Sequence, residues 1–158
     1  LLRAALGLCL GGAGGTLASP SRSRAGTPAS GPGGGAARNS ARVIAVGGAI
    51  TEIVYRLGAG DTLVATDTTS TWPDAATKLP KVGYLRALSA EGLLAMRPTL
   101  LLASADAGPP VVFEQLRAAG LRLVRSAGGH SFDALRVGVA DVGAPLGREP
   151  ESRRLDEQ

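Results

Sequence analysis

Cysteine, histidine and methionine are nearly missing from this chain of 158 residues, which contains one of each. The single cysteine, Cys9, excludes an internal disulfide, and the lack of any CxxC or Cys/His cluster excludes a zinc finger. The single histidine, His130, argues against a histidine-built metal cage or a Ser-His-Asp site. No apolar run is long enough for a transmembrane helix.

Aromatic residues and lysines are also scarce. Aromatics make up 3% of the chain, and arginine supplies all the basic residues except Lys78 and Lys81. The arginines are scattered, whereas nucleic-acid binding needs a concentrated basic face, so we expect no nucleic-acid partner despite the net charge of +4. Hydrophobic residues reach 44%, which is enough for a core, and that core must be aliphatic.

The first 41 residues differ in composition from the rest. Residues 1–18 combine Arg3, an apolar stretch and a small-x-small site, which predicts a signal peptide whose first residues are missing. The alternative is a disordered Gly/Ala-rich start. Residues 19–41 are rich in Ser, Gly and Pro without periodicity, as in a disordered linker, and we therefore expect an exported protein.

From residue 42 onward, short apolar runs alternate with helical patterns. The runs at residues 43–46, 62–66, 99–103 and 121–124 all read as buried strands, and helices are expected between them. This alternation predicts an α/β fold with a parallel sheet and helices on both faces. We expect residues 42–130 to form one lobe, after which Ser131 caps a helix with Phe132, Leu135, Val139 and Val142 on one side. Pro145, Gly147 and Pro150 are expected to interrupt this helix.

Ligands of parallel sheets bind beyond the carboxyl ends of the strands, where several polar residues are expected. Gly47-Gly48 before a helix either cradles an anion or makes a tight turn, and neither GxGxxG nor GxxxxGK[ST] occurs. Asp67 is a general base or, more commonly for its position, a turn residue. An α/β enzyme working through Asp67 or Asp106 stays an alternative, although no paired base and nucleophile supports it.

The segment that contains Tyr84 carries a more specific signal. The stretch RVIAVGGAITEIVYRLGAGD and above all the block PKVGYLRALSAEGLLAMRP resemble the haem-binding periplasmic proteins of bacterial ABC importers. This resemblance implies that Tyr84 is the axial ligand of the haem iron. The iron favours the phenolate, and we expect the nearby guanidinium of Arg86 to favour it further. Tyrosinate is an established haem ligand, and a phenolate is a hard donor suited to ferric iron.

The resemblance assigns further residues around Tyr84. Thr69 and Trp72 match a loop that lines the cleft against the porphyrin, and Gly48 completes the candidate haem site. Glu91 matches a glutamate that docks on the permease of the importer. As alternatives, Trp72 is a structural anchor beside Pro73, and Glu91 stabilises the start of its helix.

We therefore expect a monomeric, non-enzymatic haem carrier outside the cytoplasm, which delivers ferric haem to an ABC importer. The resemblance implies two α/β lobes joined by a long helix, of which residues 131–158 would be the start, with the second lobe absent. The alternatives are a siderophore- or cobalamin-binding protein of the same fold, and an inactive truncated remnant.

Overall fold

The computed structural model describes residues 41–126 and 131–157, so the expected signal peptide, nearly all of the expected linker and His130 lie outside it. Within these residues, no helix has the length and apolar character needed to cross a membrane. The elements follow in this order: β1 (Val43–Val46), α1 (Gly48–Arg56), a 3-10 turn η1 (Gly60–Thr62), β2 (Leu63–Thr66), α2 (Asp74–Thr77), α3 (Ala90–Ala95), β3 (Leu100–Ala103), α4 (Pro110–Ala118), β4 (Arg122–Arg125), α5 (Phe132–Leu146) and α6 (Glu149–Asp156).

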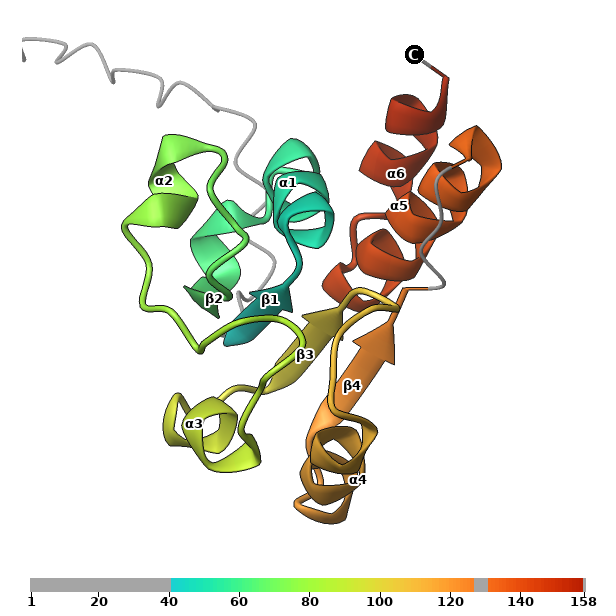
Figure 1. Ribbon diagram of the computed structural model, residues 1–158. Coiled ribbons are helices and arrows are strands. Elements are labelled where there is room, and N and C mark those ends of the chain that lie inside the picture. The colour runs from blue at the N-terminus through green and yellow to red at the C-terminus, as the bar shows by residue number, and fades with distance from the viewer. Residues whose placement is uncertain (1–40, 127–130, 158) are drawn as a thin grey trace, which may run out of the picture. The chain divides into compact units, whose positions relative to one another are not determined.

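The four strands form one sheet in the order β2-β1-β3-β4, and every neighbouring pair is parallel. β1 and β3 lie at the centre, with Val43 opposite Leu100. Strands and helices alternate along the chain, so each crossover carries a helix onto one face of the sheet (Figure 1). The predicted α/β class and parallel sheet are confirmed.

Helices cover both faces of the sheet. Successive residues of β1 point to opposite sides, and all four are apolar and buried, so each face needs a covering layer. One core lies between the sheet and helices α1 and α5, and the other between the sheet and helices α3 and α4. The first core includes Val43, Ala45, Ile53, Val54, Val139 and Val142. The second includes Ile44, Val46, Leu93, Phe113 and Leu116.

The prediction that all four strands are buried is wrong for β4. Arg122 and Arg125 at its ends are exposed at one edge of the sheet, whereas β2 at the other edge is mostly buried and pairs with residues 80–82. The Arg125 guanidinium lies over the Phe113 ring, 4.7 Å from its centroid, so its stem covers part of the core while the charge stays near water.

The C-terminal helices also differ from expectation. Leu135 is half exposed, whereas Val139 and Val142 are buried as predicted. α5 continues through Pro145 to Leu146, so the interruption expected at Pro145 is absent, whereas Gly147 ends the helix in the left-handed conformation as predicted. The interruption expected at Pro150 is absent as well, since α6 begins at Glu149 and a proline in the first turn lacks only an N–H that would have no helical partner.

Candidate functional site

The candidate site lies at the carboxyl edge of the sheet, which we call the rim. It consists of residues 47–48 after β1, 67–72 after β2, 104–107 after β3, and 83–86, which lie beside the end of β2. Topology brings these segments together, since the carboxyl ends of parallel strands share one edge.

Asp67 organises the rim after β2. Its carboxylate is fully buried and each oxygen accepts two hydrogen bonds. Oδ1 accepts from the Gly47 N–H (2.9 Å) and the Ser70 hydroxyl (2.7 Å), and Oδ2 accepts from the N–H (2.9 Å) and hydroxyl (2.6 Å) of Thr69. Burial alone would raise the pKa of Asp67. The four donors favour the anion, however, and hold the pKa of Asp67 below its ordinary value. Asp67 is thus a turn-organising residue, as its position after a strand predicted.

Gly47 and Gly48 connect this network to α1. Gly47 has a φ of 108°, which disfavours any side chain, and a Cβ there would lie 3.0 Å from the Cβ of Ser104. At Gly48 a Cβ would lie 3.1 Å from the Thr69 carbonyl oxygen. Gly48 and Thr69, both predicted site residues, are therefore in close contact, and the tight-turn interpretation of Gly47-Gly48 has direct geometric support.

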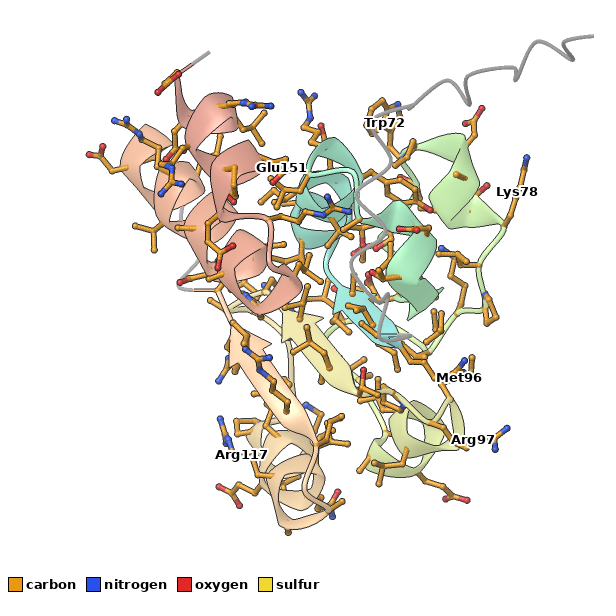
Figure 2. The ribbon with its side chains drawn as sticks, turned by 180° about the vertical axis from the view of Figure 1, so that it is seen from behind. Trp72, Lys78, Met96, Arg97, Arg117 and Glu151 are labelled. Atoms are coloured by element: carbon orange, nitrogen blue, oxygen red, sulfur yellow. The ribbon has the colours of Figure 1, made fainter. Side chains whose placement is uncertain are left out.

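Thr69 and Trp72 belong to the same loop but differ in availability. The Thr69 hydroxyl is already bonded to Asp67, whereas the Trp72 side chain is 56% exposed (Figure 2). Trp72 therefore offers a free aromatic surface near the rim, and Thr69 offers mainly its backbone and methyl group.

Tyr84 follows Gly83, whose carbonyl oxygen accepts from the Thr68 N–H at 2.9 Å. This bond brings the segment that contains Tyr84 to the carboxyl end of β2. The Tyr84 side chain is 50% exposed, so it lies outside both cores. Its backbone is fixed further by the Ala87 N–H, which donates to the Tyr84 carbonyl at 2.8 Å.

Arg86 is directed to the rim after β3. Its guanidinium lies 4.0 Å from a carboxylate oxygen of Asp106, and both side chains are largely exposed. Backbone bonds from Gly108 to Leu85 (2.9 Å) and from Leu88 to Gly108 (3.0 Å) tie the two loops together. The ion partner of Arg86 in the structure is thus Asp106.

Glu91 lies apart from these residues, exposed in the first turn of α3. Ser89 caps this helix by accepting from the Gly92 N–H at 3.4 Å, as predicted. A carboxylate in the first turn is favoured by the helix dipole, so the expected structural role of Glu91 is present.

Lys81 lies next to the rim and bonds to it, and sequence reasoning missed this residue. Its ammonium donates to the Thr66 hydroxyl (2.7 Å), the Ser70 carbonyl (2.9 Å) and the Ala76 carbonyl (3.0 Å). The available signal was its rarity: it is one of two lysines in a chain whose other basic residues are arginines.

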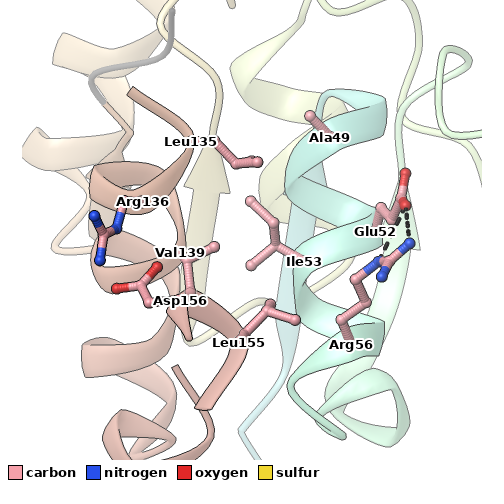
Figure 3. A pocket seen from close by; sticks show the side chains of 9 residues that line it. All are labelled: Ala49, Glu52, Ile53, Arg56, Leu135, Arg136, Val139, Leu155 and Asp156. Carbon is pink, nitrogen blue, oxygen red and sulfur yellow. Dashed lines mark hydrogen bonds and ion pairs between the residues drawn. The ribbon is translucent and has the colours of Figure 1, made fainter. Parts of the chain in front are cut away.

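A groove of about 620 Å³ opens elsewhere, between α1 and the α5–α6 pair (Figure 3). Its apolar centre is formed by Ile53, Val139 and Leu155, and the Glu52–Arg56 ion pair (2.9 Å) lies on one wall. A second hollow of about 440 Å³ borders the ends of β3 and β4 and shares Ala49, Ile53 and Leu135 with the groove. Neither hollow is lined by Tyr84 or Trp72, and both of these side chains are exposed.

Known proteins resemble this chain in both sequence and structure. Residues 43–158 match the sequence profile of the family described as periplasmic binding protein. A solved periplasmic haem-binding protein in complex with two haems is 44% identical, with a TM-score of 0.68 over 72% of this chain and 44% of that chain. A periplasmic haem-binding protein from Pseudomonas aeruginosa is 38% identical, with a TM-score of 0.70 over 73% of this chain and 42% of that chain.

A curated relative has a different ligand in its name. The vitamin B12-binding protein of Yersinia pestis (strain Pestoides F) is 36% identical over 90 residues, which cover 57% of this chain and 32% of that protein. The chain thus spans between about a third and just under half of the length of these relatives.

Proposed function

Because the chain belongs to the periplasmic binding protein family, a family of substrate-binding proteins that are not enzymes, we propose that it binds ferric haem for delivery to an ABC importer. Its place of action would be the periplasm or the outer face of the cell membrane, since the relatives are periplasmic. Similarity favours haem over cobalamin: among solved structures, identity is 44% over 72% of this chain for the haem-bound relative, against 25% over 74% for a vitamin B12-binding protein of Vibrio cholerae.

The observation that carries the proposal is the exposure of Tyr84 at the rim. A phenol that coordinates a bulky planar chelate must be reachable from solvent, and a tyrosine inside either core would be unsuitable. In this proposal Tyr84 supplies its oxygen as the axial ligand of the ferric iron. Trp72 and the backbone around Thr69 and Gly48 offer contacts to the porphyrin, and Arg86 adds positive charge beside the ligand.

The test is a haem titration of the wild type and Tyr84→Phe, followed by absorbance. The wild type is expected to show the charge-transfer bands of a tyrosinate–iron bond, and the variant is expected to lose them and to bind more weakly. The matched control is Tyr55→Phe, which alters the only other tyrosine. Tyr55 packs on the first core beside Gly60, and burial raises its pKa, so this variant should keep the bands. Equal spectra for the two variants would refute ligation by Tyr84.

Cobalamin binding is the second candidate, and the Yersinia pestis relative is the observation that favours it. A titration with aquocobalamin separates the two functions. Saturable binding of aquocobalamin that survives Tyr84→Phe, combined with no binding of haem, would replace the haem proposal. A chain that binds neither ligand and whose melting temperature responds to neither would support the inactive remnant.

We propose residues 42–130 as one lobe of a monomeric carrier and residues 131–158 as the beginning of its connection to a second lobe. In this arrangement Glu91 docks onto an arginine of the permease, because its carboxylate is exposed and α3 leaves it free to face a partner. Glu91→Arg should reduce haem delivery to a reconstituted importer without changing haem affinity. Glu114→Arg, at an exposed position of α4, is the control. Equal delivery by both variants would exclude docking through Glu91.

A further inference from the structure

Two segments would border the proposed ligand: the Trp72 segment, residues 67–77, and the Tyr84 segment, residues 80–86. The Tyr84 segment begins as an added partner of β2. The Thr66 N–H donates to the Pro80 carbonyl at 3.0 Å and the Val82 N–H donates to the Thr66 carbonyl at 2.9 Å. Backbone pairing therefore fixes the chain just before Tyr84.

The Lys81 side chain leaves this paired stretch and reaches into the Trp72 segment. Its nitrogen contacts the Ser70 carbonyl, two residues before Trp72, and the Ala76 carbonyl, which lies in α2 beyond Trp72. The third contact, with the Thr66 hydroxyl, holds the same nitrogen at the end of β2. Lys81 thus bonds to the chain on both sides of Trp72, while its own backbone belongs to the segment that leads to Tyr84.

The chemistry of these contacts suits an ammonium group. It carries three donors, and all three have acceptors that are neutral. Hydrogen bonds with a charged donor are stronger than those between neutral groups. The three acceptor oxygens surround a single nitrogen atom. The donors of a guanidinium are spread over three nitrogens in one plane, so an arginine could not bond to all three oxygens in this way. This explains why a lysine occupies the position in a chain that otherwise uses arginine.

We propose that Lys81 is a positioning residue, which holds the Trp72 and Tyr84 segments in a fixed relation and so preorganises the two sides of the ligand site. This inference rests on the proposed function, because it assumes a ligand in contact with both segments. Preorganisation raises affinity by reducing the ordering that binding would otherwise require.

The test compares Lys81→Met with Lys78→Met. Lys78 is exposed and projects away from the ribbon after α2, so it is a matched control in the same loop (Figure 2). Trp72 is the only tryptophan, and its fluorescence anisotropy therefore reports on the Trp72 segment without any ligand. Lys81→Met is expected to lower this anisotropy and to weaken haem binding about tenfold, while the charge-transfer bands at saturation stay. Lys78→Met should change none of these.

The outcomes separate this inference from the proposed function. Unchanged anisotropy and haem affinity in Lys81→Met would overturn the inference even if Tyr84 is the iron ligand. If the wild type binds no haem, the proposed function fails, and so does the role of Lys81 at a haem site; the anisotropy then decides only whether Lys81 orders the segment.

A measurement on the wild type covers the case in which Lys81→Met does not fold. An amine-acetylating reagent, with modified sites identified by peptide mass spectrometry, should label Lys81 several-fold more slowly than Lys78, because its nitrogen must first leave three acceptors. Bound haem should slow the labelling of Lys81 further and leave that of Lys78 unchanged. Equal labelling of the two lysines, or no effect of haem on Lys81, would overturn the inference.

Discussion

Asp67 and Asp106 each follow a strand at the same edge of the sheet, yet their surroundings differ completely. Asp67 is fully buried with four donors around its carboxylate, whereas Asp106 is largely exposed and has Arg86 at 4.0 Å. The difference shows that position after a strand does not determine the role of an aspartate. The role is determined by the hydrogen-bond donors that the following residues supply. For Asp67 these donors include the hydroxyls of Thr69 and Ser70, two and three positions later.

The comparison also bears on the enzyme alternative. Both oxygens of Asp67 are fully occupied by hydrogen bonds, so the carboxylate has no free site at which to take a proton from a substrate. Asp106 is accessible, but its neighbour is an arginine, which supplies no nucleophile. This agrees with membership of a family of binding proteins.

The largest loss of stability is expected from Asp67→Ala. The substitution leaves the N–H groups of Gly47 and Thr69 and two hydroxyls without their acceptor in a buried place, and we expect the free energy of unfolding to fall by about 3 kcal/mol. Urea unfolding followed by circular dichroism measures this. A loss no greater than that of Asp106→Ala would show that burial of Asp67 has no energetic consequence.

Gly47→Ala tests the residue that lies between the two rim loops. Its N–H bonds to Asp67, its φ is 108°, and an added Cβ would press on Ser104 in the loop after β3. We expect a loss of about 2 kcal/mol from backbone strain and crowding. Gly83→Ala is the control for the strain, since its φ of 103° is close to that of Gly47 and an added Cβ would make only an ordinary contact, 3.7 Å from the Ala87 carbonyl oxygen. Equal losses would assign the whole effect to φ and none to the contact with Ser104.

A further effect on stability is expected in acid and arises from the titration of Asp67. The pKa of Asp67 is lower in the folded protein, so its stabilising contribution is complete above the ordinary aspartate pKa of about 4 and is lost as the pH falls through the folded value. The stability difference between the wild type and Asp67→Asn should therefore be constant from pH 7 to about pH 5 and shrink below about pH 4. A difference that stays constant to pH 2 would contradict the lowered pKa.

Much of the fold was predictable because its signals are local. The run at residues 43–46, the turn at Gly47-Gly48 and the cap at Ser89 depend on neighbours in the sequence, and all three are confirmed. The edge position of β4 was not predictable, because it depends on strand order. α6 was not predicted as a separate helix, because its residues have little apolar surface and were included in the start of the linking helix that the resemblance implies, although Pro150 near its start and Arg153 and Arg154 in its last turn are ordinary helix signals.

The site shows the same division. Exposure of Tyr84 and Trp72 fits the motif that suggested them, but their roles stay predictions. The partners of Lys81 are 5, 11 and 15 residues away in the sequence, and no spacing rule connects such positions. Arg86 was expected to act on Tyr84, yet its ion partner in the structure is Asp106, from a loop that only the tertiary fold brings near.

The smallest effect is expected from Asp106→Asn. The substitution removes a charge from an exposed pair at 4.0 Å, and such pairs contribute little because water screens them and both side chains are mobile. We expect a change in the free energy of unfolding below about 0.5 kcal/mol, decreasing further in high salt.

The same substitution would free Arg86 of its ion partner, so haem affinity should rise slightly if the Arg86 guanidinium acts on the bound ligand. A fall in affinity would show instead that Asp106 is needed to hold Arg86 in place, and a loss of stability comparable to that of Asp67→Ala would remove the contrast between the two aspartates.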